Sequence, residues 1–158
     1  MTQSVRSHTG PTALIKLAQD VLNTEIAGLA AVRDRLNART PEKAPLVLAL
    51  GLLAACTGRV VVTGIGKSGL VGRKLAATFS STGTPAFFLH PVEGAHGDLG
   101  SLRKDDVIIA ISNSGETAEL NAILPALKSL GTSLIAMTGR EDSTLGRLAD
   151  VTLHSGVP

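Results

Sequence analysis

Two short segments, TGIGKSG (63–69) and SNSGET (112–117), gather glycines and hydroxyl side chains where an apolar run gives way to a helical pattern. At the start of a helix the first N–H groups lack partners within the helix, and the helix dipole adds partial positive charge. Such corners favour an anion, so the two segments predict a cradle for a phosphate group. The residues expected to contact the ligand here are Gly66, Ser68, Ser112, Asn113, Ser114 and Thr117. For SNSGET taken alone, an ordinary helix cap at Ser114 is the alternative.

The first segment does not have the Walker A pattern of phosphate loops but does have the glycine pattern of dinucleotide-binding folds. A Walker A loop needs a glycine five positions before Gly66, where this chain has Val61. Gly64, Gly66 and Gly69 satisfy the G-x-G-x-x-G pattern of dinucleotide-binding folds. However, the next apolar run ends in FFLH, not in the acidic residue that would bind a ribose. Lys67 lies inside the pattern and suits a small phosphate sugar, so a nicotinamide enzyme is kept as the alternative.

Four potential metal ligands lie within HPVEGAHGDLG (90–100), namely His90, Glu93, His96 and Asp98. Their spacing matches no helical metal-binding pair. We therefore expect a polar loop that closes over a ligand, with His96 placed to hydrogen-bond a substrate hydroxyl. A metal site and a plain solvated loop are the alternatives.

The elements that must position these residues repeat one unit of apolar run, corner and helical pattern. The apolar runs predict strands at 59–64, 85–90, 106–112, 133–138 and 150–155. The helical patterns predict a long amphipathic helix from Leu14 to Leu36, a second helix ending near Cys56, and helices at 69–82, 115–130 and 144–149, with 91–102 mostly irregular. Because the runs are too apolar to have one face in water, they predict a parallel sheet covered on both sides. The expected fold is α/β, a three-layer doubly wound five-stranded sheet of flavodoxin-like order, with both corners at its switch point.

Length and composition exclude several classes of protein. The chain has 158 residues, of which 44% are hydrophobic and 18% charged, as expected for one globular domain. We assign residues 11–158 to that domain and residues 1–10 to a flexible N-terminus. The 15 Lys and Arg residues form no run, so neither nucleic acid nor a membrane is an expected partner. The single cysteine, Cys56, favours a reducing cytoplasm.

The segment GIGKSGLVGRKLAATFSSTGTPAFFLHPVEGAHGDLG (64–100), followed by DVIIAISNSGETAEL (106–120), resembles the SIS (sugar isomerase) domain of arabinose 5-phosphate isomerases. Members of that family interconvert D-arabinose 5-phosphate and D-ribulose 5-phosphate and supply the precursor of the Kdo sugar of lipopolysaccharide or capsule. They assemble as tetramers. The resemblance therefore implies a sugar-phosphate ligand, a homo-oligomer and no required cofactor.

The same resemblance implies roles for individual residues. Lys67 and Glu119 match catalytic positions: Lys67 would steady the substrate oxygens or phosphate, and Glu119 would move a proton through a cis-enediol. His90 matches a zinc site of the family, in which the metal is structural or inhibitory. The positions matched to substrate contact are Gly83, Thr84 and His96.

The resemblance departs at the end of the chain. The family has a further catalytic glutamate, a further catalytic histidine and a pair of CBS domains that match nothing here, and His154 is expected inside the fifth strand. We therefore expect the SIS domain to be truncated at its C-terminal end and inactive alone. Two alternative functions are a non-catalytic module that senses a phosphosugar and an interaction module built on the long first helix.

Overall fold

The computed structural model describes residues 10–36, 40 and 43–156, which form two compact units. The first unit contains helix α1 (Pro11–Arg35), close to the long amphipathic helix predicted from the sequence. Most of its large apolar side chains are exposed, among them Leu14, Val21 and Ile26. The predicted flexibility of residues 1–10 falls almost wholly outside the described residues.

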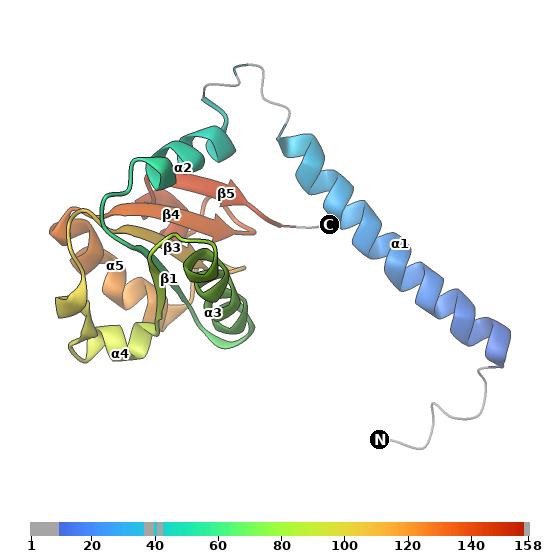
Figure 1. Cartoon of the computed structure of the whole chain (residues 1–158). Helices are drawn as coiled ribbons and strands as arrows, with labels where there is room; N and C mark the ends of the chain where they lie inside the picture. The colour runs from blue at the N-terminus through green and yellow to red at the C-terminus, as the bar shows by residue number, and fades with distance from the viewer. Residues whose placement is uncertain (1–9, 37–39, 41–42, 157–158) are drawn as a thin grey trace. The chain divides into compact units, whose positions relative to one another are not determined.

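The second unit, Leu36–Gly156, is the α/β domain and contains all the strands of the described chain (Figure 1). Its elements in chain order are α2 (Pro45–Ala54), β1 (Val60–Gly64), α3 (Gly66–Ser81), β2 (Ala86–Leu89), α4 (Pro91–Ala95), a 3₁₀ helix (Asp98–Ser101), β3 (Val107–Ile111), α5 (Ala118–Leu130), β4 (Ser133–Thr138), α6 (Thr144–Leu148) and β5 (Val151–His154). All five predicted strands are present.

The five strands form one sheet in the order β2-β1-β3-β4-β5, and every pair is parallel. The predicted fold class and the flavodoxin-like order are therefore confirmed. The order reverses direction between β1 and β3, where Val60 pairs with Val107 and Gly64 pairs with Ile111. This register brings the carboxyl ends of the two strands to the same edge of the sheet.

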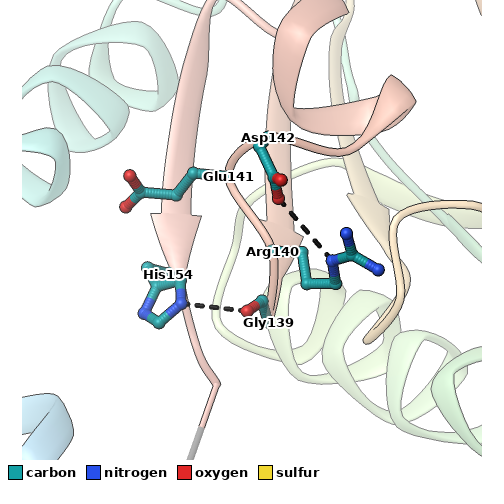
Figure 2. A pocket seen from close by; sticks show the side chains of 5 residues that line it. All are labelled: Gly139, Arg140, Glu141, Asp142 and His154. Carbon is teal, nitrogen blue, oxygen red and sulfur yellow. Dashed lines mark hydrogen bonds and ion pairs between the residues drawn. The ribbon is translucent and has the colours of Figure 1, made fainter.

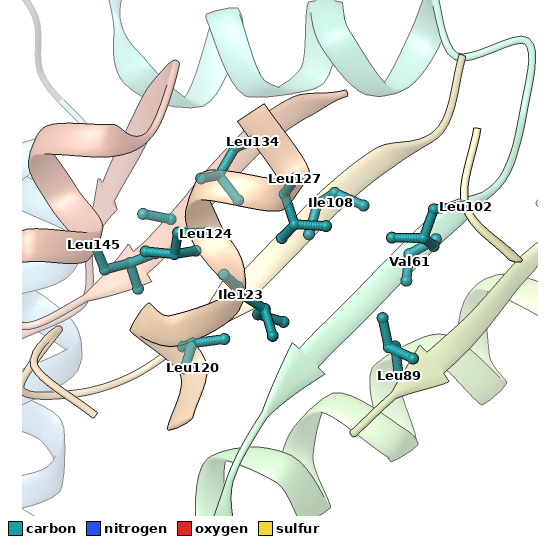
Figure 3. Packing of buried hydrophobic residues seen from close by; sticks show 12 residues of the cluster. Val61, Leu89, Leu102, Ile108, Leu120, Ile123, Leu124, Leu127, Leu134 and Leu145 are labelled. Atoms are coloured by element: carbon teal, nitrogen blue, oxygen red, sulfur yellow. The ribbon is translucent and has the colours of Figure 1, made fainter. Parts of the chain in front are cut away.

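Both faces of the sheet are covered by helices, as strands this apolar require. On one face Val61, Ile108 and Leu134 pack against the buried leucines of α5 and α6 (Figure 3). On the other face the alternate strand residues, such as Val62 and Ile109, pack with side chains of α2 and α3. Each strand contributes to the hydrophobic clusters on both faces, because successive side chains along a strand point to opposite faces of the sheet.

The prediction that 91–102 is mostly irregular is wrong, because this segment contains α4 and the 3₁₀ helix. Pro91 is compatible with the start of α4, because proline is favoured at the first position of a helix, where its N–H would have no partner within the helix. His90 supports this start because its Nδ1 accepts the N–H of Val92 at 3.3 Å. Among the described residues, no helix is both long and apolar enough to cross a membrane.

Candidate functional site

The two predicted corners lie side by side at the switch point of the sheet. Gly64 and Ile111 are paired across β1 and β3, and a Cβ on Gly64 would lie 2.9 Å from the carbonyl oxygen of Ile111. From this point α3 leaves to one face of the sheet and α5 to the other (Figure 1). In open α/β sheets the crevice at such a point is where ligands bind.

The first corner starts α3 directly at Gly66, three residues earlier than predicted. Gly66 has φ +59°, a left-handed conformation that favours glycine. The N-cap residue, Ile65, makes no side-chain hydrogen bond to the helix, and the first turn holds no acidic residue. Lys67 is exposed beside this helix start, and Ser68 is half-buried. The N-terminus of a 16-residue helix and a lysine therefore face the same edge, an arrangement suited to a phosphate.

The second corner is a compact loop closed by its own side chains. Ser112 is buried, with 3% of its surface exposed, and its Oγ accepts the N–H of Gly115 at 3.1 Å. The hydroxyls of Ser112 and Thr117 share a 2.8 Å hydrogen bond. Gly115 completes the turn at φ +65°. Ser112 and Thr117 therefore shape the loop, while Asn113 and Ser114 are exposed.

Helix α5 begins at Ala118, with Thr117 as its N-cap and no side-chain cap bond. The alternative that Ser114 caps this helix is wrong, because the Ser114 Oγ accepts the N–H of Glu116 at 3.2 Å within the loop. The first turn of α5 keeps its free N–H groups at the carboxyl edge of the sheet. Glu119 lies in this first turn and is exposed. Both helix starts of the switch point thus lack side-chain caps.

Glu116 has a role that the sequence did not reveal. Its Oε1 accepts the N–H of Thr144, the first residue of α6, at 2.7 Å. Hydrogen bonds from Thr144, from its side chain and then from its backbone, lower the pKa of Glu116, and the charges of Arg147 and Arg140 act in the same direction. The glutamate is therefore held ionised at the start of a neighbouring helix.

Ser143 and Asn121 also support the loop and were not predicted. Ser143 is fully buried; its Oγ donates to Arg140 O at 2.6 Å and accepts the N–H of Gly146 at 3.2 Å. Asn121 donates from Nδ2 to Gly115 O at 3.2 Å, and its Oδ1 is buried without a hydrogen-bond partner among the described residues. Ser143 carried a local signal, a serine just before a helical pattern. Its position beside Gly115 has no signal in the sequence.

The remaining predicted site residues are divided between the two edges of the sheet. His90 directly follows the carboxyl end of β2 and therefore lies at the same edge as the two corners, whereas His96 lies at the far end of α4. Gly83, with φ +96°, and Thr84 precede β2 and lie at the opposite, amino edge. Within one chain the structure does not bring Gly83 and Thr84 together with the corners.

The described residues do not by themselves form the predicted zinc site. His90 uses Nδ1 to accept the N–H of Val92. In the described part of the chain, no three His, Cys, Asp or Glu side chains lie close enough together to hold a metal ion. His90 alone is too few ligands for zinc, so no chemical step is assigned to a metal here.

A cavity of about 410 Å³ lies at the carboxyl ends of β4 and β5 (Figure 2). Its lining residues are Gly139, Arg140, Glu141, Asp142 and His154. His154 is on β5, as predicted, and its Nε2 lies 2.9 Å from Gly139 O. The Arg140 Nε is 3.6 Å from the Asp142 Oδ1. None of the residues predicted to bind substrate lines this cavity.

Comparisons with known proteins identify the family to which this chain is similar. The family model described as "SIS domain" matches residues 53–158. "Arabinose 5-phosphate isomerase KdsD" of Salmonella typhi is 51% identical over 140 residues, which are 89% of this chain and 41% of the relative. The protein of the same name from Pseudomonas aeruginosa is 57% identical over 111 residues, 70% of this chain and 34% of the relative. The chain thus spans between about a third and two fifths of the length of these curated relatives.

A solved structure matches over most of its own length. It is c3406 of E. coli CFT073 in complex with arabinose 5-phosphate, with a TM-score of 0.81 and 44% sequence identity, covering 95% of this chain and 77% of that one. The solved structure agrees with the fold, a five-stranded parallel sheet with flanking helices, and the family model agrees with the family. The chain belongs to the SIS domain family.

Proposed function

We propose that this chain is the sugar-phosphate domain of an aldose–ketose isomerase that interconverts D-arabinose 5-phosphate and D-ribulose 5-phosphate for Kdo biosynthesis. The observation that carries the proposal is the pair of uncapped helix starts at the switch point, with Lys67 exposed on one and the SNSGET loop closing the other. The names of the KdsD relatives and the arabinose 5-phosphate bound to c3406 support this choice of substrate.

The proposed site divides the substrate between a phosphate end and a reacting end. The free N–H groups of α3 and α5, with Ser114 and Lys67, hold the phosphate, because helix starts and a cation favour an anion. The reaction moves a proton between C1 and C2 of the opened sugar through a cis-enediol, which requires a base near the reacting carbon. Glu119, exposed in the first turn of α5, is the proposed acid–base group of this chain.

Two variants separate binding from chemistry. Lys67→Met removes a cation and is expected to weaken binding of arabinose 5-phosphate about tenfold. Glu119→Gln keeps the shape of the side chain and is expected to leave affinity within about threefold while abolishing turnover. Isothermal titration of the chain measures the first effect, and the rate of ketose formation by the full-length protein measures the second. Ribose 5-phosphate, the C2 epimer, is the control ligand.

The same experiment tests the alternative, a module that binds a phosphosugar without converting it. If the full-length protein binds arabinose 5-phosphate but forms no ketose, the isomerase proposal is lost and the binding module stands. If it binds neither sugar phosphate, both proposals fail.

We also propose that the protein is a cytoplasmic homo-oligomer and requires no cofactor. The unpaired Cys56 agrees with a reducing compartment.

Exposed apolar side chains on α2 and α3, which cover the same face of the sheet, support self-association: Leu46, Val47, Leu50, Leu70 and Val71. Light scattering of the wild type and of Leu70→Glu tests the oligomer, since a charge at this 69% exposed position should favour the monomer. Activity that survives treatment with a chelator would support the absence of a required metal.

A further inference from the structure

The loop 112–117 lies against the segment 138–145, which joins β4 to α6. Hydrogen bonds connect the two segments although they are far apart in the sequence. The bonds run from the N–H groups of Gly139, Leu145 and Thr144 to Asn113 O (2.9 Å), Gly115 O (3.1 Å) and Glu116 Oε1 (2.7 Å), respectively. The segment 138–145 therefore holds the loop in place through hydrogen bonds, and it is called the template segment below.

Glu116 contributes the side-chain bond of this set, and it is the shortest of the three. A carboxylate that accepts a backbone N–H at a helix start makes a charge-assisted bond, stronger than the neutral bonds beside it. The direction in which its neighbours move the pKa of Glu116 shows that the ionised form is favoured here. The link is therefore in place at neutral pH.

Glu116 is also connected to the groups proposed to hold the phosphate. Its own N–H donates to Ser114 Oγ at 3.2 Å, and it lies two residues before Ala118, where α5 begins. Glu116 thus stands between the exposed serine of the loop and the free N–H groups of the helix. Its side chain points to α6 and binds Thr144, so the carboxylate itself is not part of the phosphate cradle.

We propose that Glu116 is a positioning residue: by fastening the loop to the start of α6, it fixes the direction of the Ser114 hydroxyl and of the first N–H groups of α5. This inference rests on the proposed function, namely that the loop 112–117 binds the phosphate of a sugar. A misplaced donor loses much of its effect even when the fold is intact. A purely structural role for Glu116 would instead affect stability alone.

The bond can be removed from either side with little change elsewhere. Glu116→Ala removes the acceptor. Thr144→Pro removes both donors to Glu116, because proline has neither the N–H nor the hydroxyl of threonine. Position 144 is the first of a helix, where proline is favoured, and Ser143 before it is extended, with φ −72° and ψ 166°. Glu116→Gln keeps an acceptor oxygen. Glu141→Ala is the matched control, an exposed glutamate of the same template segment with the same change in charge.

Titration of the chain with arabinose 5-phosphate, and with inorganic phosphate, gives the test. We expect the Kd to rise about 5- to 20-fold in Glu116→Ala and in Thr144→Pro. The Kd of the double variant should be no higher than the higher Kd of the two single variants, because each substitution removes the same link between Glu116 and Thr144. Glu116→Gln should stay within about threefold of the wild type, and Glu141→Ala should match it.

Thermal melts of the same variants separate positioning from stability. If Glu116→Ala and Thr144→Pro melt at lower temperature but keep the wild-type Kd, Glu116 is structural and the inference is overturned. If their effects on Kd add in the double variant, they do not act through one bond, which also overturns it. If the wild type binds neither probe, the proposed function fails and this inference with it, so the two failures are distinguishable.

Discussion

Gly115 is the position where the structure predicts the sharpest cost for one added methyl group. A Cβ there would lie 1.9 Å from the Oγ and 2.4 Å from the Cβ of Ser143. Ser143 is fully buried and its hydroxyl bonds on both sides, to Arg140 O and to the N–H of Gly146, so moving it aside would break both bonds. Gly115→Ala therefore combines left-handed strain of about 1–2 kcal/mol with overpacking of about 1–3 kcal/mol. The expected loss in the free energy of unfolding is about 2–5 kcal/mol.

Gly131→Ala is the matched control for the strain alone. Gly131 caps α5 at φ +81°, and a Cβ there would meet no atom within 4 Å. Its substitution should cost about 1–2 kcal/mol, so the difference between the two variants isolates the contact with Ser143. Urea unfolding followed by far-ultraviolet circular dichroism is the suitable assay, because the chain has no Trp or Tyr for fluorescence.

A double variant gives a second check on the same reasoning. Ser143→Gly removes the atoms that clash but also loses the cap of α6, which should cost about 1 kcal/mol. Gly115→Ala combined with Ser143→Gly should therefore be less destabilised than the sum of the two single variants. Equal losses in Gly115→Ala and Gly131→Ala, or additive losses in the double variant, would refute the steric argument.

Three further predictions concern charged groups. The Asp106 side chain is completely buried and accepts both the N–H and the guanidinium of Arg59, so Asp106→Asn should lower the free energy of unfolding by about 2–4 kcal/mol in the same urea assay. Lys128 and Asp150 form a partly exposed pair at 2.6 Å, and Lys128→Met should cost less than about 1 kcal/mol. Because folding lowers the pKa of Glu116, its contribution to stability is present above the ordinary glutamate value of about 4.3 and is lost as the pH falls through the lower folded value. Glu116→Gln should therefore flatten the acid side of a plot of stability against pH.

The fold could be predicted because its signals are local. A run such as Val107–Ile111 is apolar at every position and so predicts a strand covered on both faces, and a glycine corner after it marks the end of the strand. These two features, repeated along the chain, were enough to give the five parallel strands and to place both corners at the switch point. Helix starts were less accurate: α3 begins at Gly66 and α5 at Ala118, because the period of apolar residues does not fix the first residue of a helix.

The support of the site could not be predicted, because it depends on pairs that are distant in the sequence. Glu116 bonds to a residue 28 positions later, and the need for glycine at 115 comes from Ser143 on another segment. In the sequence, Glu116 has the same appearance as any acidic residue near a helix start. Contacts of this kind follow from the order of the strands, since β3 and β4 are neighbours and their corners must therefore touch.

The two corners differ in how far their polar groups are fixed before a ligand binds. In the loop 112–117 the hydroxyls of Ser112 and Thr117 are already bonded within the loop, which fixes its shape before any ligand arrives. At the other corner the cation of Lys67 is exposed on a flexible side chain beside an uncapped helix. A preorganised set of donors loses little entropy on binding, whereas a mobile cation adds attraction at the cost of its own ordering. Recognition of a phosphate at this switch point should therefore depend chiefly on the geometry of backbone N–H groups, and the residues that maintain that geometry should matter as much as those that touch the ligand.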